Sequence, residues 1–457
     1  MVLFLCSLAV RVLFWLPPPV RNAPPRFDEK AYFMKGAALV GLVRGADEGA
    51  WEDESDVWSA HFRSRDGAWE RVYGGGAFPP LQGVTLAAGF LLFGDRVAAA
   101  RLAMVLLSAL TTPVIFLLTR SLASRRAAIL AAVAHMVYPD FIAFSHLLWS
   151  ETTYLFWLLL SLVWVVRVPR AGQERRALLL SAGAGLALGL AALTRAAALP
   201  FLLLFPLWVA WTRSGVRKRL FSASVLLIVA ILVLLPWEIL LVKKEGALIP
   251  LSSSAGFNVY LGATAGLDED EGNAQGVRWA ARKAIRERAR ATGASEAEAA
   301  RELALQAIRS DPASYVHRSF ERLQSMWTEN RIILRQFALG SYPELSAAGL
   351  VTLRIFLAAT LILFVFLAAC GLWNRHPRLH AKRWIVLGLL AAGIPPLLTV
   401  ASSRMALPVL ALLLPAVGLG LDGFVGRERR GERLLPGVLF SLLVLVNVCV
   451  RWSSFPW

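Results

Sequence analysis

Two neighbouring carboxylates, Asp28 and Glu29, stand shortly after the first apolar stretch of the chain. A carboxylate in a partly desolvated cleft can act as a general base, because desolvation raises its pKa toward the working pH. We predict that Asp28 is such a base. Glu29 is the second catalytic candidate, as an alternative base or a metal ligand, unless it simply faces water. The competing interpretation is that both residues start a surface helix, since acidic side chains are favoured in a first turn.

Three arginines interrupt apolar stretches of the chain: Arg101, Arg195 and Arg404. Charged side chains at membrane depth are costly and usually functional. Because the planar guanidinium holds phosphate oxygens through two parallel hydrogen bonds, we expect these arginines to contact a phosphate. The alternative is that their long stems carry the charge to lipid headgroups. Lys243 and Lys244 could serve the same purpose, although such a pair commonly anchors the end of a span.

The composition indicates that these residues are held in a membrane protein. The chain has 457 residues, 57% of them hydrophobic and 17% charged, with a mean hydropathy of +0.58. Soluble domains carry roughly 25% charged residues. The three cysteines lie in apolar stretches, at neither metal nor disulfide spacing. The first apolar stretch, residues 2–16, lacks an early basic region and a small-residue cleavage site, so we interpret it as a membrane anchor.

Eleven stretches approach the roughly 20 apolar residues that a spanning helix needs. The run 80–93 is too short to cross comfortably, and we expect it to lie along the interface. The predicted fold is therefore an all-α polytopic membrane protein with about 11 transmembrane helices and external juxtamembrane helices. The predicted spans are 1–19, 98–119, 127–145, 151–166, 177–194, 196–212, 220–241, 348–373, 384–401, 405–422 and 434–450.

The basic residues orient these spans. Five short loops hold 19 lysines and arginines and three glutamates, which is +16 of the net charge of +17. Basic loops stay in the cytoplasm. The charge is thus explained by topology, and a nucleic-acid partner has no support. The five loops are 120–126, 167–176, 213–219, 374–383 and 427–433.

Three domains follow along the chain. Residues 1–242 form an N-terminal transmembrane module, whose first external loop, 20–97, carries Asp28 and an acidic patch over 47–56. Residues 243–347 form a large, mostly helical external loop, and 348–457 add C-terminal transmembrane helices. In the large loop we predict a helix over 278–290 and a second one capped by Ser295 that proline stops at Asp311-Pro312.

Five ordered motifs resemble the glycosyltransferase C superfamily, especially family-39-like enzymes related to protein O-mannosyltransferases and lipid A aminoarabinose transferases. The likeness extends from about residue 25 to residue 410, and its motifs follow the order that the family shows. One departure is Phe78, where many relatives have a basic residue or histidine before the two prolines. If that residue normally helps to hold the donor phosphate, another cation must replace it. The motifs are FDEKAY (27–32), FPPL (78–81) followed by LFG (92–94) and ARL (100–102), FSHLLWSE (144–151), SAGFNVYLG (254–262) and ALQAIRSDPASY (304–315).

The resemblance implies an inverting transfer of a sugar from a polyprenyl-phosphate donor to an acceptor on the external face of a bacterial-type inner membrane. It implies a supporting acidic residue near Asp140 and Glu151, so Glu151 is a candidate second carboxylate; the alternative is a helix-start acid. His146 could pair with either one. Asn258 and Tyr260 line the acceptor side or only shape the loop. A divalent metal ion is left open, because no His/Cys/Asp set has metal spacing.

A transporter or flippase for lipid-linked glycans is the rival interpretation, and a non-catalytic assembly protein on the same frame is a third. A transporter should place its polar groups near the bilayer midplane, often in two related halves. Here the polar groups gather at one interface, and no internal repeat is visible. The sequence gives neither the sugar nor the acceptor, which could be a protein, a lipid or a glycan, nor the oligomeric state.

Overall fold

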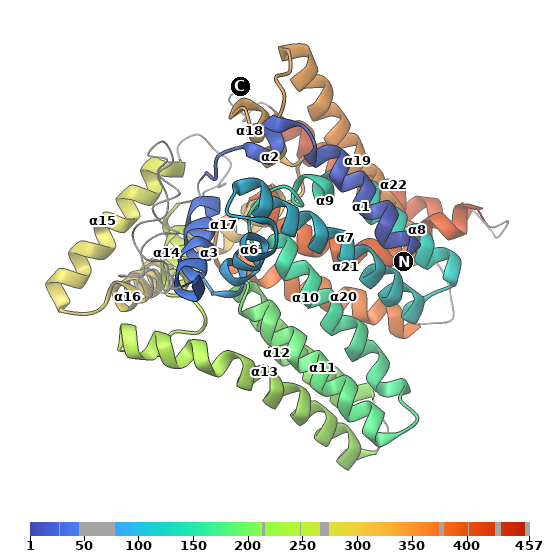
Figure 1. The fold of residues 1–457 in the computed structure, drawn as a ribbon, viewed down its shortest axis with the longest axis horizontal. Coiled ribbons are helices and arrows are strands. Elements are labelled where there is room, and N and C mark those ends of the chain that lie inside the picture. The colour runs from blue at the N-terminus through green and yellow to red at the C-terminus, as the bar shows by residue number, and fades with distance from the viewer. Residues whose placement is uncertain are drawn as a thin grey trace. The chain divides into compact units, whose positions relative to one another are not determined.

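The computed structural model describes most of the chain. It covers residues 1–26, 28–44, 78–212, 215–246, 248–265, 274–373, 379–400, 402–425 and 431–452. Every regular element in these ranges is a helix (Figure 1). The chain divides into two compact units, each assembled from separate stretches of sequence. The acidic patch over 47–56 falls outside the described residues.

Unit 1 comprises residues 1–118, 135–239 and 336–344. Its main hairpin is formed by α10 and α11, which pack along each other, with α12 against them. Residues 97–118 of α7 and residues 216–239 of α13 also belong to it. The helices that contribute to this unit are α1 (Val2–Trp15), α2 (Pro18–Asn22), α3 (Asp28–Arg44), α6 (Leu81–Phe93), α7 (Val97–Leu122), α9 (Pro139–Ala143), α10 (Glu151–Arg167), α11 (Glu174–Ala192), α12 (Leu199–Thr212) and α13 (Val216–Glu245), with the short η1 (Val168–Arg170) and η2 (Ala196–Ala198).

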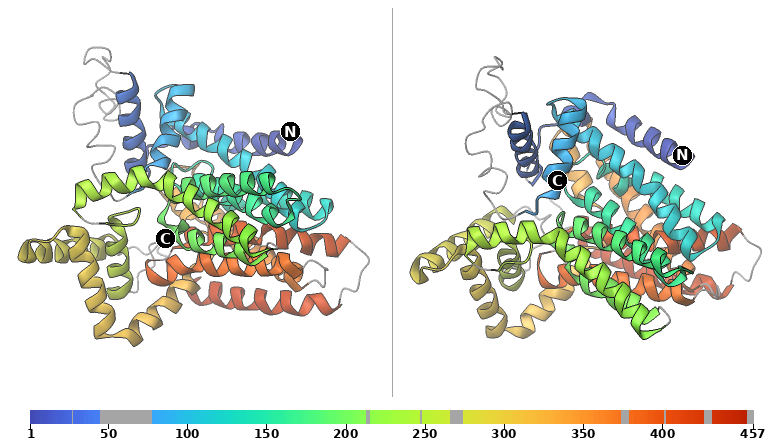
Figure 2. Two further views of the ribbon diagram at one scale, coloured as in Figure 1. Left: turned by 90° about the horizontal axis from the view of Figure 1, so that it is seen from below. Right: turned by 60° about the horizontal axis from the view of Figure 1, so that its bottom comes forward.

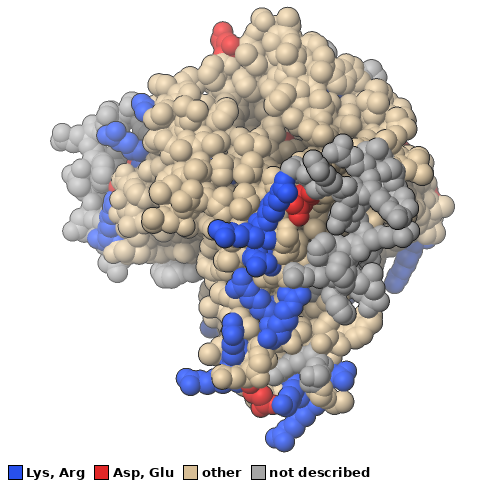
Figure 3. Space-filling model, turned by 90° about the vertical axis from the view of Figure 1, so that its right-hand side faces the viewer, with Lys and Arg blue, Asp and Glu red and all other residues tan. Residues whose placement is uncertain are grey.

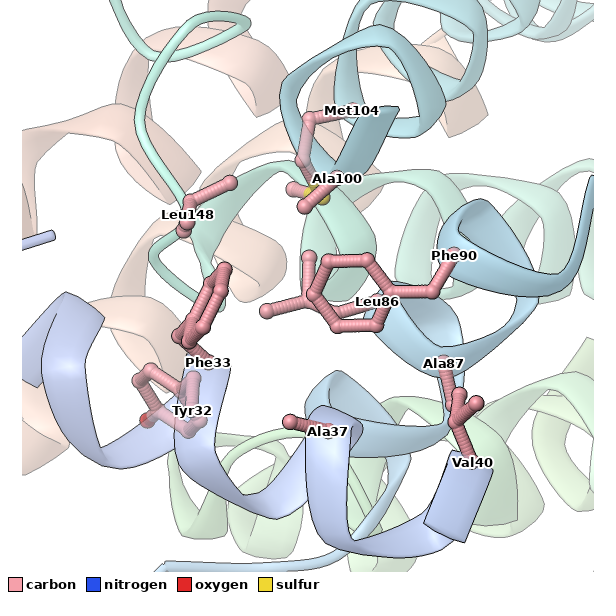
Figure 4. Close-up of a cluster of buried hydrophobic side chains, with 10 residues drawn as sticks. All are labelled: Tyr32, Phe33, Ala37, Val40, Leu86, Ala87, Phe90, Ala100, Met104 and Leu148. Carbon is pink, nitrogen blue, oxygen red and sulfur yellow. The ribbon is translucent and has the colours of Figure 1, made fainter. Parts of the chain in front are cut away.

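A hydrophobic cluster fixes α3 and α6 against the rest of unit 1. Phe33 of α3 meets Phe90 of α6 edge-on, with ring centroids 5.1 Å apart (Figure 4). Glycine allows the two helices to approach closely, because a Cβ on Gly36 would lie 3.0 Å from Leu86 Cβ and 3.1 Å from the Gly83 carbonyl oxygen. The cluster continues into α7 and Leu148, so the helix that starts at Asp28 has a fixed position.

The orientation of α3 and α6 differs from that of the longer helices of unit 1. Figure 2 shows both running across the direction of α7, α10 and α11. α6 has 13 residues and is about 20 Å long, which is shorter than the hydrocarbon core. This arrangement supports the interfacial position that we predicted for 80–93.

Unit 2 comprises residues 119–134, 240–335 and 345–457. In this unit α19 packs against α21 and α22, and α14, α16 and α15 pack on one another. The helices that contribute to it are α8 (Arg125–Val137), α14 (Ser254–Thr264), α15 (Ala274–Thr292), α16 (Glu296–Ser310), α17 (Pro312–Ser325), α18 (Arg331–Ala338), α19 (Ala347–Trp373), α20 (Leu379–Leu398), α21 (Ala406–Val425) and α22 (Gly431–Arg451), with the short η3 (Ser403–Met405).

The all-α membrane fold is confirmed. Among the described residues, six helices are long and apolar enough to cross a membrane, and four shorter apolar helices accompany them. The predicted caps in the large loop are also confirmed. Ser295 Oγ accepts from the Glu298 amide at 3.2 Å, and Pro312 opens the next helix one residue after Asp311. The number of eleven spans and the division into three consecutive domains stay predictions.

Two predicted spans are interrupted. The stretch 1–19 is divided between α1, which ends at Trp15, and the start of α2. The stretch 127–145 was expected to be continuous, but α8 ends at Val137, α9 is a short helix that starts at Pro139, and residues 144–150 follow without a regular helix. Proline lacks the N–H that a continuing helix needs and clashes with the preceding turn. The irregular segment 144–150 is buried throughout, so its backbone polar groups must find partners inside the protein.

The basic loops of unit 1 lie at one end of its hairpins. Arg170 at the end of η1 and Arg175 and Arg176 in the first turn of α11 are exposed, as are Arg217 and Lys218 at the start of α13. Figure 3 views this end and shows lysine and arginine side chains gathered there, with few acidic ones. α10 has 17 residues, so its first residue lies about 25 Å from this end. Glu151 and the basic residues that follow α10 therefore lie at opposite ends of this helix.

Candidate active site

The first part of the site is one face of α3. Asp28, Tyr32 and Lys35 follow each other at helical spacing, so their side chains share this face. Asp28 is half-buried at the first turn, where the amino end of the helix favours a carboxylate. Burial raises the pKa of Tyr32 to about 12, and the charges of Asp28 and Glu151 act in the same direction while Arg195 opposes them. The phenol is therefore neutral near pH 7, and all three charges lie within electrostatic reach of it.

The second part of the site is formed where α10 begins and α11 ends. Glu151 is the first residue of α10, and Arg195 follows α11 in an extended conformation. Arg195 Nη1 donates to Glu151 Oε1 at 2.6 Å and to Ser150 Oγ at 3.0 Å. Ser150 Oγ also accepts from the Tyr32 hydroxyl at 3.2 Å, which connects this pair to α3. The Arg195 side chain is 21% exposed and that of Glu151 only 2%.

Lys35 adds a cation that the sequence analysis did not single out. Its Nζ donates to the Phe78 carbonyl at 2.9 Å. The ammonium also lies 6.0 Å from the Phe78 ring centroid and 5.9 Å from that of Trp237, at cation–π range. Phe78 is the position at which the chain departs from its presumed relatives. A positive charge is thus present at this place, supplied by α3 instead of by residue 78.

Glu29 and Arg101 form a second ion pair, which is closed to solvent. Both side chains are 3% exposed, and Arg101 Nη1 lies 3.4 Å from Glu29 Oε1. Glu29 also accepts from the amides of Leu148 at 2.7 Å and Arg26 at 3.3 Å. Glu29 therefore does not face water. Arg101 further donates to the His146 carbonyl and, at 2.8 Å, to the Ala23 carbonyl, which leaves no side of this guanidinium open to solvent.

This closed pair holds the irregular segment 144–150. Glu29 binds the amide of Leu148 and Arg101 the carbonyl of His146, while Gln82 Nε2 donates to the Leu148 carbonyl at 2.8 Å. These contacts satisfy backbone groups that a helix would otherwise pair internally. Because the segment leads directly into Ser150 and Glu151, the pair fixes where the second part of the site begins.

His146 lies in the irregular segment 144–150, and Asp140 lies in α9 just before it. His146 Nε2 lies 3.0 Å from the Arg11 carbonyl, and burial lowers the pKa of the imidazole to about 4. A histidine with this pKa is neutral near pH 7, so its contact is structural. Asp140 lies in the first turn of α9 and is buried.

The remaining predicted site residues lie in unit 2. Arg404 is the middle residue of η3, between α20 and α21. Asn258 and Tyr260 are half-buried on α14, and Tyr260 packs in a cluster that also receives Met405. Unit 2 therefore brings the Tyr260 helix next to the segment that carries Arg404. Lys243 is exposed near the end of α13.

The described part of the chain shows no cluster of metal-ligating side chains. No three histidine, cysteine, aspartate or glutamate side chains within it are grouped so that they could hold a metal ion.

Sequence reasoning singled out Asp28, Glu151 and Arg195 but missed Tyr32, Lys35 and Ser150. A signal for Tyr32 and Lys35 was present, since they lie four and seven residues after Asp28 on a predicted helix. Ser150 had no comparable signal. The assembled group offers a half-buried carboxylate, a neutral phenol and two cations within one unit. Such a set can accept a proton from a hydroxyl and neutralise a departing phosphate.

Part of this chain is similar to a known protein family. Residues 78–237, fewer than half of the chain, match the family model of dolichyl-phosphate-mannose-protein mannosyltransferases. No curated protein sequence matches the chain.

Solved structures superimpose on nearly the whole of this chain at low sequence identity. An oligosaccharyltransferase of Archaeoglobus fulgidus, solved with a tethered acceptor peptide, superimposes with a TM-score of 0.52 at 14% identity over 99% of this chain and 54% of its own. The oligosaccharyltransferase AglB from Archaeoglobus fulgidus, in complex with an inhibitory peptide and a dolichol-phosphate, gives a TM-score of 0.52 at 14% identity over 99% of this chain and 55% of its own. ArnT from Cupriavidus metallidurans bound to undecaprenyl phosphate gives 0.40 at 14% over 99% and 88%.

The chain thus spans about half the length of the archaeal protein. The family model and the archaeal fold confirm the predicted resemblance to the glycosyltransferase C superfamily, and with it an integral membrane protein.

Proposed function

We propose that this chain is a membrane glycosyltransferase that moves a sugar from a polyprenyl-phosphate-linked donor to an acceptor on the external face of a bacterial-type inner membrane, with inversion at the sugar. The observation that carries the proposal is the grouping of Asp28, Tyr32 and Lys35 on α3 with Arg195 and Glu151. The matched family, named for dolichyl-phosphate mannose, supports the donor class.

The proposed step is a single displacement. The acceptor hydroxyl oxygen attacks the anomeric carbon and forms the new glycosidic bond, while the bond between that carbon and the phosphate oxygen breaks. Asp28 takes the hydroxyl proton, and the bonding electron pair leaves with the polyprenyl phosphate. Arg195 and Lys35 stabilise the charge that develops on the phosphate. One attack from the face opposite the leaving group inverts the configuration.

Other residues support this step. Glu151 fixes the guanidinium of Arg195 through the 2.6 Å contact, and Tyr32 positions Ser150 beside the same guanidinium. We assign Glu29 and Arg101 to holding the segment 144–150. For Arg404 we retain the proposal of a phosphate contact, and for Asn258 and Tyr260 that of the acceptor side, both from the sequence.

The position of the charges supports an enzyme more than a transporter. Asp28, Glu151 and Arg195 lie at helix ends, and Glu151 is separated from the basic loops by the whole length of α10. A transporter is expected to hold its substrate groups near the middle of its spans. The same separation supports an external site, since the basic loops belong in the cytoplasm.

The test compares wild type with Asp28→Asn in membranes supplied with a pool of radiolabelled polyprenyl-phosphate sugars. The matched control is Lys30→Gln, which changes an exposed charge two residues away. We expect wild type and control to label an endogenous acceptor and Asp28→Asn to lose about 10²-fold or more, the usual contribution of a general base. Equal labelling by Asp28→Asn, at equal amounts of inserted protein, would exclude Asp28 as the base.

A further inference from the structure

Helix α15 carries one strongly basic face. Arg282, Lys283, Arg286 and Arg290 are exposed on it, and the side chain of Trp279 is 65% exposed. At 3.6 residues per turn these five residues fall within about 100° of the helix circumference, with Trp279 between Arg286 and Arg290. We call them the cationic face of α15.

The opposite side of α15 is fixed inside unit 2. Ile285 packs with Ala299 and Ala300 of α16, and Ala281 packs with Leu261 of α14. The helix therefore cannot rotate about its axis without breaking this cluster. The cationic face is held outward by apolar packing on its back.

Among the described residues, little negative charge lies beside the cationic face. Glu287 lies at its edge, with a carboxylate oxygen 3.9 Å from Lys283 Nζ. Arg288, which points to the other flank of the helix, is bound to Glu302 of α16 at 3.1 Å. Arg282 stacks over the Phe257 ring at 5.4 Å, a contact that leaves its charge in place. Arg282, Arg286 and Arg290 thus form a stripe at four-residue spacing.

Membrane topology does not account for this charge. The positive-inside rule explains basic residues in cytoplasmic loops, whereas α15 lies between α13 and α19 in the loop that the same rule places outside. Both flanking helices are candidate spans, so α15 is tethered near the membrane surface at either end of its loop. A basic face with an exposed tryptophan is the composition of helices that lie at the headgroup layer.

We propose that the cationic face of α15 docks on anionic phospholipid headgroups of the membrane that holds the chain. The arginine forks bind headgroup phosphates, and the Trp279 indole enters the interface between them. Trp279 is the one large apolar side chain on this face, so the contact stays at headgroup depth. The proposal concerns a surface of unit 2 and is independent of the proposed transfer activity.

The experiment uses the full-length protein in nanodiscs of two compositions. One is phosphatidylcholine alone, and in the other about a third of the lipid is phosphatidylglycerol. Hydrogen exchange of the backbone amides over 276–292 is followed by mass spectrometry. We expect exchange to be about tenfold slower in the anionic discs, because each basic residue near an anionic surface adds to binding, and we expect high salt to remove the difference.

Two triple variants, each of which loses three positive charges, separate docking through the cationic face from a general effect of net charge. The test variant is Arg282→Gln, Arg286→Gln and Arg290→Gln, and the control is Arg288→Gln, Arg301→Gln and Arg309→Gln. In the test variant, residues 276–292 should exchange at the same rate in both discs, whereas in the control they should still exchange more slowly in the anionic discs. Exchange of the α14 and α16 peptides shows whether both variants are folded.

Three outcomes would overturn the proposal. The first is equal exchange of wild type in both discs. The second is lipid-dependent protection that survives in the test variant. The third is protection by soluble polyphosphate but not by anionic discs, which would assign the face to a soluble polyanion.

Discussion

Among its described residues, unit 1 contains two arginine–glutamate pairs that look alike in sequence and differ in their surroundings. Glu29 and Arg101 are each 3% exposed, and the arginine also binds two backbone carbonyls. Arg195 is 21% exposed and binds the hydroxyl of Ser150 in addition to Glu151. We refer to them as the closed pair and the open pair.

A buried charge in this protein can hold the fold or take part in the chemistry. Which role it has depends on whether its other hydrogen-bond partners are backbone groups or side chains. The closed pair is completed by backbone groups of an irregular segment, so it replaces hydrogen bonds that a helix would have made. The open pair is completed by side chains, and part of the Arg195 side chain stays exposed. Only the open pair can receive an anion without losing contacts that hold the fold.

The largest expected effect is a loss of stability on breaking the closed pair. Arg101→Met leaves Glu29 buried without its counter-charge, which costs about 3–5 kcal/mol. Thermal unfolding in detergent should show a midpoint roughly 10 °C lower, because 1 kcal/mol shifts the midpoint by about 2–4 °C in a folding unit of about 200 residues, the size of unit 1. Arg96→Met, at an exposed arginine beside the same helix, is the control and should unfold like wild type. A variant as stable as wild type would remove the structural role of the closed pair.

Breaking the open pair should weaken substrate binding more than it lowers the stability of the fold. Arg195→Met is expected to weaken binding of polyprenyl phosphate by about 10- to 100-fold, because a charge-assisted contact contributes about 1.5–3 kcal/mol. The unfolding midpoint should fall less than in Arg101→Met. Arg195→Lys, which keeps the charge but not the fork, should bind with intermediate affinity. Unchanged lipid binding by Arg195→Met would contradict the comparison.

Lys35 extends the comparison to α3. Lys35→Met should weaken polyprenyl-phosphate binding by about tenfold through loss of one cation. In the double variant Lys35→Met, Phe78→Lys, a positive charge returns to the neighbouring position and should restore part of the affinity. If the single variant loses binding and the double variant does not regain it, a lysine at position 78 cannot replace Lys35. Binding that the single variant retains would exclude Lys35 from the phosphate site.

A smaller, pH-dependent effect tests the segment that the closed pair holds. The folded-state pKa of His146 is lowered to about 4 by burial, below its value of about 6.5 in an unfolded chain. The unfolded state therefore binds more protons in this window, so the contribution of His146 is complete above about pH 6.5 and is lost as the pH falls toward 4. The unfolding midpoint of wild type should fall in that window, and that of His146→Gln should fall less. Identical pH profiles would contradict a buried, neutral His146.

The sequence predicted the parts of the fold that depend on local pattern. Apolar stretches indicated membrane helices, and Ser295 with Glu298 marked a helix start that the structure confirms. The end of α8 was missed because apolar character continues past Pro139, although the proline breaks the helix. Local pattern cannot show which irregular segment has its backbone satisfied from elsewhere.

The site was only partly predictable for a related reason. Asp28 was singled out by its place after the first apolar stretch, and Arg195 because it interrupts an apolar stretch. The pairing of Glu29 with Arg101 joins residues 72 positions apart and depends on how α3, α6 and α7 pack. From residue types alone the closed pair and the open pair are equivalent, so only burial and hydrogen-bond partners separate them.

The most direct test is to map where the phosphate of the donor binds. A polyprenyl-phosphate analogue with a photoreactive group next to its phosphate is crosslinked to the protein in membranes, and labelled peptides are identified by mass spectrometry with unlabelled lipid as competitor. The account predicts competed labelling on residues 28–35, 150–155 or 194–198, and its loss in Arg195→Met but not in the exposed control Arg96→Met. Competed labelling confined to the middle of the spanning helices, unaffected by Arg195→Met, would contradict it.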